Sequence, residues 1–166
     1  MRLEAMAVKI PHVEGHPNRV AFNGILTVVN KASDKAPSGA RGHRVMLTRE
    51  AAEKALPSLL GMAVDYTPGW DGHDARRKIG LLTEANLVGD RIVVSGYLYA
   101  RDFPEVAESI EAQGPGAMGM SYEIADARVD DMRAEVWKLT RVTFTGAAVL
   151  LRDKAAYRTT SFQMAS

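Results

Sequence analysis

The sequence predicts an α+β protein in which antiparallel strands predominate. Five segments alternate between apolar and polar residues or are rich in β-branched residues, which is typical of strands: 20–29, 79–85, 91–99, 118–124 and 136–146. Two of these, 79–85 and 91–99, flank the turn sequence Val88-Gly89-Asp90 and therefore predict a β-hairpin. Two other segments carry helix start and stop signals.

The first predicted helix covers 49–60. Thr48 is a suitable N-cap, because its hydroxyl can accept a hydrogen bond from a backbone N–H of the first turn. Glu50 lies in that turn, where an acid favours the helix dipole. Pro57 is expected to interrupt the helix and Gly61 to end it.

The second predicted helix begins in the sequence Asp102-Phe103-Pro104-Glu105 and stops at Gly114. Asp102 is the expected N-cap, and Glu105 can close a capping box. Pro104 suits the first helical position, because its missing N–H has no partner there in any case.

Composition limits the possible functions. The chain has 166 residues, a formal net charge of +1 and no cysteine. Disulfides and thiolate chemistry are therefore excluded, and no strong attraction to nucleic acid or to an anionic membrane is expected. We predict one domain over 1–166, with a mobile loop at about 30–42 and a tail of little structural signal at about 155–166.

A serine lies in a predicted strand that directly follows a glycine-rich turn. Ser121 follows Gly114, Gly116 and Gly119, and the alternation of 118–124 places it on the opposite face from Met120. These glycines add little bulk around the serine and leave backbone N–H groups free to donate. Both features suit a serine nucleophile and an oxyanion pocket. An ordinary tight turn before a strand has the same composition, so both interpretations stay open at this point.

Histidines occur on two polar loops. His73 lies in the Gly/Asp loop that precedes the strand at 79–85, and it is a candidate general base or simply a solvated side chain. His12 and His16 have a spacing that can bind a metal on a helix, but Gly15 and Pro17 argue against a helix there.

The last third of the chain is less clear. The charged stretch 125–135 predicts a solvated hairpin loop. Neither face of the strand at 136–146 is cleanly apolar, so the pattern does not show which face is buried. A separate apolar run follows at 147–151.

The order of these features resembles one family. A His loop, a hairpin, a capped helix, a glycine-rich turn, a Gly-x-Ser strand and a Thr/Val strand follow one another between about 64 and 157. The matching segments are Gly72-His73-Asp74, Met118 to Ile124, and Leu139 to Ala148. This pattern is similar to the head maturation (prohead) proteases of tailed phages, which are related in fold to the herpesvirus assemblins.

The resemblance implies a small, mostly antiparallel β-barrel with flanking helices and a serine endopeptidase that needs no metal and no cofactor. Ser121 would be the nucleophile and His73 the general base. The third residue of the family lies on the strand after the nucleophile, where Arg141, Thr143 and Thr145 stand here. None of these is a carboxylate.

The site that the resemblance implies has further members. Thr143 is the expected third residue, with Glu123, Asp126 or Asp74 as substitutes. Arg152 and Gly119 are expected to support the oxyanion site, with the surface-arginine interpretation of Arg152 equally open.

The resemblance also implies partners and a location. The substrates would be capsid and scaffold proteins, and possibly the chain itself, within an assembling procapsid in the host cytoplasm. A homo-oligomer, plausibly a dimer, is expected; nucleic acid and membranes are not expected partners.

Two alternatives remain. One is a capsid component that kept the fold and lost activity, which the missing carboxylate favours. The other is an unrelated β-barrel binding module, which predicts that His73 and Ser121 lie far apart.

Overall fold

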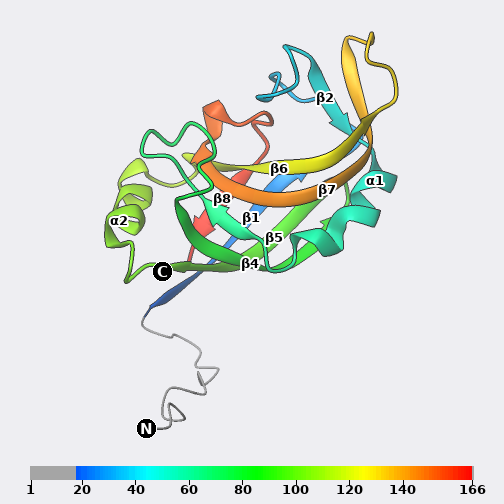
Figure 1. The fold of residues 1–166 in the computed structure, drawn as a ribbon. Coiled ribbons are helices and arrows are strands. Elements are labelled where there is room, and N and C mark those ends of the chain that lie inside the picture. Colours follow the sequence, from blue (N-terminus) through cyan, green and yellow to red (C-terminus); the bar gives the residue numbers. More distant parts are fainter. Residues whose placement is uncertain (1–17, 166) are drawn as a thin grey trace, which may run out of the picture.

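The computed structural model describes residues 18–165, so the predictions made for His12 and His16 lie outside the described residues. Within these described residues, eight strands and two α-helices follow one another (Figure 1). They are β1 (Arg19–Val28), β2 (Arg44–Leu47), α1 (Arg49–Ala55), β3 (Ala63–Asp65), β4 (Lys78–Val88), β5 (Arg91–Tyr99), α2 (Pro104–Gln113), β6 (Met118–Val129), β7 (Val136–Leu151) and β8 (Ser161–Met164). Within this part of the chain, neither helix has the length and apolarity that crossing a membrane requires.

All eight strands belong to one curled sheet. Its order is β2-β7-β3-β4-β5-β1-β8, and β6 pairs with β7. The pairs β2–β7 and β3–β7 are parallel and the other pairs are antiparallel. Figure 1 shows β6 and β7 passing over β1, β4 and β5, with α1 and α2 at the flanks. The prediction of a mostly antiparallel barrel with flanking helices is thus confirmed.

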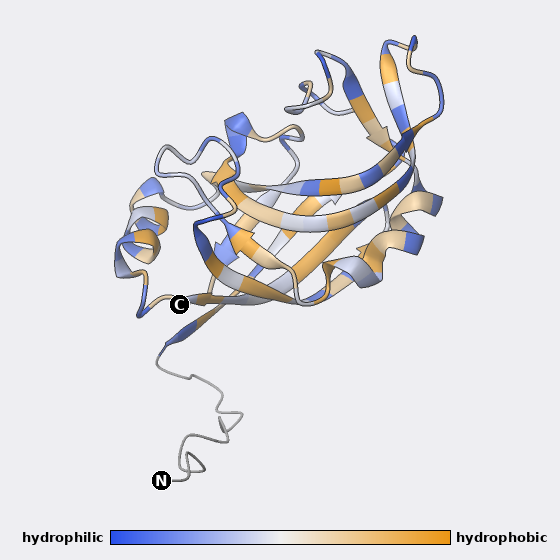
Figure 2. Ribbon diagram, viewed as in Figure 1, coloured by the Kyte–Doolittle hydropathy of each residue, from blue (hydrophilic) through white to orange (hydrophobic). Residues whose placement is uncertain are grey.

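The sheet curls so far that its ends meet. Strand β6 contacts both β1 and β8. A Cβ atom on Gly24 would come within 2.8 Å of the Met120 Sδ and would also overlap the Ser161 backbone carbonyl, so this approach requires glycine. Figure 2 shows apolar residues along the strands that enclose the interior. The largest fully buried side chains include Phe144, Leu26, Leu47, Leu59, Ile79, Leu82 and Ile92.

The local predictions had mixed outcomes. The hairpin is confirmed as β4–β5, and Thr48 caps α1 by accepting a hydrogen bond from the Ala51 N–H at 3.2 Å. The chain continues as a 3₁₀ turn through Pro57. The prediction that Asp102 caps α2 is wrong: the N-cap is Phe103, and Asp102 instead accepts a hydrogen bond from the Asn18 side chain. Pro104 alone fixes where α2 begins.

The charged stretch is not a loop throughout. Strand β6 continues to Val129, and β7 is one strand of 16 residues that joins the two predicted segments. Charged side chains fit here because all four positions from 125 to 128 are exposed. Only 130–135 forms the turn between the strands.

Bulges explain why no buried face could be assigned to β7. The buried residues have odd numbers at Trp137 and Leu139 but even numbers at Val142 and Phe144. The pairing with β6 shifts by one residue between these pairs and again between Gly146 and Phe144. Each extra residue reverses which side of the strand faces the core, so a strict alternation cannot persist.

The loop at 30–42 and the C-terminal segment hold each other. The backbone N–H groups of Asp34 and Lys35 donate to the Ala156 carbonyl, and the Tyr157 hydroxyl donates to the Lys31 carbonyl at 2.8 Å. Lys35 Nζ also donates to the Asp153 carbonyl. The segment after 155 then forms β8 against β1. This loop forms one wall of the cleft described below.

Candidate active site

The position of Ser121 follows from its pairing in the sheet. It lies opposite Ala148 of β7, near the start of β6. Its neighbour Met120 is 1% exposed and packs toward Gly24, while Tyr122 places its ring edge-on to Phe144. The strand's alternation therefore leaves the Ser121 side chain on the other face, as the sequence predicts.

His73 is held by an anchored loop, although its neighbours are glycine and aspartate. Trp70 is buried, donates from its indole Nε1 to the Ser109 hydroxyl of α2, and accepts the Leu151 N–H at its carbonyl. Beyond the histidine, Asp74 accepts hydrogen bonds from the Arg76 N–H and the Arg77 side chain. The His73 side chain is only 19% exposed.

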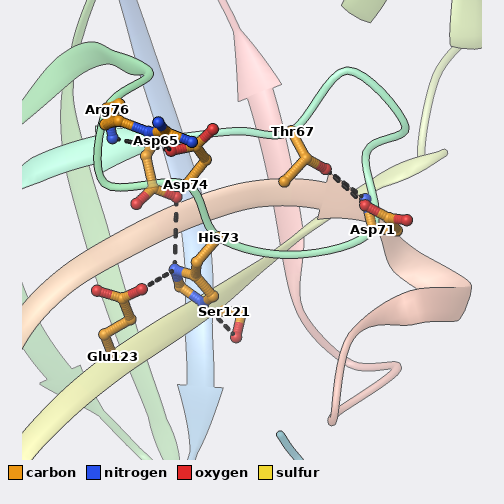
Figure 3. A network of polar contacts seen from close by, with 8 residues as sticks. All are labelled: Asp65, Thr67, Asp71, His73, Asp74, Arg76, Ser121 and Glu123. Atoms are coloured by element: carbon orange, nitrogen blue, oxygen red, sulfur yellow. Dashed lines mark hydrogen bonds and ion pairs between the residues drawn. The ribbon is translucent and has the colours of Figure 1, made fainter.

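The two predicted residues meet. His73 Nε2 lies 3.0 Å from Ser121 Oγ, although 48 positions separate them in the sequence (Figure 3). This is the distance at which an imidazole can accept a hydroxyl proton. The proximity contradicts what an unrelated binding module would predict.

Two carboxylates face the other ring nitrogen. His73 Nδ1 lies 3.4 Å from Asp65 Oδ1 and 3.4 Å from Glu123 Oε1 (Figure 3). Neither approach is a short, well-directed hydrogen bond, and both Nδ1 and Asp65 Oδ1 are buried. The Asp65 side chain is 5% exposed and that of Glu123 is 39% exposed.

Sheet pairing explains how these groups converge. Ala148 of β7 pairs with Ser121 on one side and with Asp65 of β3 on the other. Residues in one row of a sheet point to the same face, and so does Glu123, two positions after Ser121. The His73 ring contacts all three side chains, Ser121 through Nε2 and the two carboxylates through Nδ1.

A glycine makes room for Glu123. It pairs with Gly146, and a Cβ atom there would lie 3.3 Å from Glu123 Oε2. The carboxylate therefore lies against the bare backbone of β7. This is the strand on which the resemblance places the third catalytic residue.

The structure separates Thr143 from this cluster. Thr143 pairs with Ala125, whereas Ser121 pairs with Ala148. Five positions along a strand (148 minus 143) correspond to roughly 16 Å. Asp126 lies on the bulge with φ of 52° and is exposed.

Asp74 serves its own loop. The backbone N–H of Arg76 is the main cause that holds the pKa of Asp74 below its usual value, and the side chains of Arg76 and Arg77 add to it. The carboxylates at Nδ1 are Asp65 and Glu123.

Arg152 and Gly119 lie together at the start of the serine strand. A Cβ atom on Gly119 would come 2.5 Å from Thr160 Oγ1 and 3.2 Å from the Arg152 Cα, so this contact depends on glycine. The Arg152 N–H donates to the Ala117 carbonyl, and its guanidinium lies close to Gly116. Arg152 thus braces the glycine-rich turn.

A cleft of about 680 Å³ opens beside the pair. Ser121 and His73 line it together with residues of β6, of the 35–40 loop and of the segment after β7. Lys154 contributes a basic side chain and Trp137 an aromatic one. The cleft is large enough to hold several residues of an extended peptide.

No protein-family model and no curated protein sequence matches this chain. Solved structures do match. KSHV protease, in a complex with a hexapeptide phosphonate inhibitor, aligns with a TM-score of 0.52 and 11% identity over 87% of this chain. The fold is that of an assemblin-type viral protease. The alignment covers 65% of the KSHV protease chain.

A second match is the capsid assembly protease of bacteriophage T4, with a TM-score of 0.48 and 11% identity. It covers 78% of this chain and 97% of that one. Both structures are named as viral proteases.

Sequence reasoning missed Asp65. The only local signal is an acid that ends a short apolar run, Ala63-Val64, and such acids are common. Its closeness to Ser121 depends on β3 pairing in parallel with β7, a contact between segments more than 80 positions apart. Glu123 was named as a possible substitute for the third residue.

Proposed function

We propose that this protein is a serine endopeptidase with Ser121 as nucleophile and His73 as general base. The observation that carries this proposal is the 3.0 Å contact between His73 Nε2 and Ser121 Oγ beside an open cleft. A nucleophile and a base within hydrogen-bond reach, with the base oriented by a third group, are what acyl transfer by serine requires.

The carboxylates at Nδ1 select the ring tautomer. An ionised carboxylate only accepts hydrogen bonds, so Asp65 and Glu123 favour a proton on Nδ1. The lone pair of Nε2 is then free to accept the Ser121 proton. We infer that Asp65, with Glu123 beside it, takes the orienting role for which Thr143 was predicted.

The reaction then proceeds in two steps. Ser121 Oγ attacks the peptide carbonyl carbon while its proton passes to Nε2, and the imidazolium returns this proton to the leaving amine. Water next attacks the acyl-enzyme, again losing a proton to Nε2, which returns it to Ser121 Oγ. The peptide ends as a carboxylic acid and a free amine.

The oxyanion must be stabilised by donors near Ser121. The N–H of Met120 is occupied by Thr160 Oγ1, and that of Arg152 by the Ala117 carbonyl. We therefore assign Arg152 and Gly119 a supporting role: together they hold the glycine-rich turn in place next to the nucleophile.

The substrates that we propose are capsid and scaffold proteins, cut inside an assembling procapsid in the host cytoplasm. This step rests on the resemblance of the sequence to prohead proteases and on a viral protease fold. A homo-oligomer, plausibly a dimer, belongs to the same proposal, and sedimentation of the purified chain tests it.

The second candidate function is an inactive structural relative of the same fold. Its main support was the lack of a carboxylate at the third position. Two carboxylates at His73 Nδ1 remove that support.

The test is covalent labelling by a peptidyl phosphonate, measured by intact mass. The wild-type chain should gain one adduct, and Ser121→Ala should gain none. Ser38→Ala is the matched control, because Ser38 is an exposed serine of the 30–42 loop that lines the same cleft and should leave labelling as in the wild type.

The same proteins are then incubated with the capsid protein. Truncated capsid protein from the wild type and Ser38→Ala alone supports the maturation role. Absence of both the adduct and cleavage in the wild type overturns the protease proposal in favour of the structural relative.

A further inference from the structure

The atoms behind His73 form a set of possible metal ligands. Asp65 Oδ1, His73 Nδ1 and Glu123 Oε1 lie on the side of the ring away from Ser121 (Figure 3). One ligand atom from each of these residues lies within 4.8 Å of the others. They come from three separate segments, β3, the His73 loop and β6, which the sheet pairing holds together.

Two of the three atoms lack satisfactory partners. Asp65 Oδ1 and His73 Nδ1 are buried, and neither makes a well-directed hydrogen bond. The Asp65 side chain is 5% exposed, and its Oδ1 lies 3.4 Å from His73 Nδ1. A buried carboxylate oxygen without a good partner is costly, and a bound cation would satisfy it together with the ring nitrogen.

The two separations from His73 Nδ1 fit a small tetrahedral ion. Zinc binds nitrogen and oxygen at about 2.0–2.2 Å, which places neighbouring ligand atoms about 3.3–3.6 Å apart. Both carboxylate oxygens lie 3.4 Å from His73 Nδ1. An imidazole among the ligands favours zinc over magnesium or calcium, which prefer oxygen.

We propose that Asp65, His73 and Glu123 form a zinc site, with water as the fourth ligand, and that zinc switches the enzyme off. The inhibition, unlike the binding, rests on the proposed function. Glu123 is the most exposed of the three, so it can swing aside to admit the ion.

The inhibition follows from the two nitrogens of one ring. Zinc at Nδ1 takes the lone pair of that nitrogen, so the proton of the neutral ring must sit on Nε2. Nε2 then donates and cannot accept the Ser121 proton. Metal binding and general-base catalysis are therefore mutually exclusive at His73.

The first measurement is calorimetric titration of the full chain with zinc chloride, supported by the visible absorption of Co²⁺ in the same site. One equivalent should bind, with the intense absorption of four-coordinate cobalt. Glu123→Gln and Asp65→Asn should each weaken binding by at least about tenfold, because each removes an anionic ligand.

Two controls test whether the assignment is specific. His12→Gln/His16→Gln removes the two histidines that are closely spaced in the sequence, and Glu105→Gln removes an exposed acid on α2. Both should bind zinc as the wild type does. Circular dichroism checks that Asp65→Asn folds, and the exposed Glu123 position provides an answer if it does not.

The second measurement is the rate of phosphonate labelling at Ser121 with zinc and after EDTA. Labelling should fall as the site fills and recover on chelation. The proposal is overturned if no zinc binds, if binding survives Glu123→Gln unchanged, or if it is lost in the His12/His16 variant.

The two proposals can fail separately. Zinc binding at Asp65, His73 and Glu123 without any labelling would support the metal site and contradict the protease proposal. Labelling without zinc binding would support the protease proposal and contradict the metal site.

Discussion

The two histidines that the structure describes lie at opposite ends of the β6–β7 pair and have opposite surroundings. His43 stacks on Trp137 at 4.4 Å, and its Nδ1 lies 2.9 Å from the Ala134 carbonyl, next to the β6–β7 turn. His73 has a hydroxyl at one nitrogen and two carboxylates at the other. Both follow a glycine in a polar loop, so sequence context alone does not separate them.

The difference shows where reactive chemistry can be held. His43 has a neutral backbone acceptor and an aromatic neighbour, which together make a stable structural contact. His73 stands over the part of β7 that is flanked by β6 and β3 and buried from Gly146 to Leu150. At the His73 end, β3 and β6 both pair with β7 and fix the positions of the groups around the ring.

Replacing each histidine is the strongest way to test this comparison. His73→Ala should slow phosphonate labelling at Ser121 by roughly 10²- to 10⁴-fold, because the serine loses its general base. His43→Ala should leave the labelling rate unchanged and lower the free energy of unfolding by about 1 kcal/mol. Labelling kinetics and denaturant unfolding of both variants provide the measurements.

Similar labelling rates in the two variants would contradict the different roles of His43 and His73. Slower labelling of His43→Ala at unchanged stability would also contradict them, because His43 would then take part in the chemistry.

The two carboxylates can be ranked by the same logic. Asp65→Asn should slow labelling by on the order of 10²-fold or more, because an amide no longer selects the Nδ1–H tautomer. An Asp→Asn change in a trypsin-type triad has this effect. Glu123→Gln should cost less than about tenfold, because the side chain is 39% exposed and water can replace it.

NMR of the His73 ring separates orientation from simple structural damage. The wild type should show the proton on Nδ1, and Asp65→Asn should show a mixture of tautomers with its fold retained. If Glu123→Gln is the more damaging change, Glu123 is the orienting residue and Asp65 has a supporting role.

The parts that sequence could predict are local or follow chain order. Alternation predicted the hairpin, Thr48 was recognised as a cap, and the order of the segments led to Ser121 and His73. Asp65 was missed because its role arises only when β3 pairs with β7 in parallel. Thr143 was chosen from the family's strand order and from its hydroxyl, and the bulges near Thr140 and Thr145 shift that register.

Two predictions that were based on charged residues were wrong. The stretch 125–129 looked like a loop, yet charged residues suit an exposed part of β6. Asp102 was predicted as the N-cap, but α2 begins at Pro104, so the N-cap position falls on Phe103. In both places a nonlocal or competing local contact decided the outcome.

Tyr157 provides the smallest expected effect and concerns the end where His43 lies. Its hydroxyl donates to the carbonyls of Lys31 and Val45, joining the 30–42 loop to β2. Burial raises the pKa of Tyr157 above its usual value. Tyr157→Phe should therefore lower the free energy of unfolding by about 1–2 kcal/mol at pH 7.

The pH dependence of that difference has a definite sign. The raised pKa favours the neutral phenol in the folded state, so its contribution is fully present below the unfolded pKa of about 10 and is lost as the pH rises above it. The stability gap between wild type and Tyr157→Phe should stay constant up to about pH 9.5 and narrow beyond it. Tyr122, whose pKa is also raised by burial, adds to the rise in the pKa of Tyr157 through its charge. A gap that stays constant through pH 11 would mean that the Tyr157 hydroxyl is not buried, and that the loop is not fastened to β2 through it.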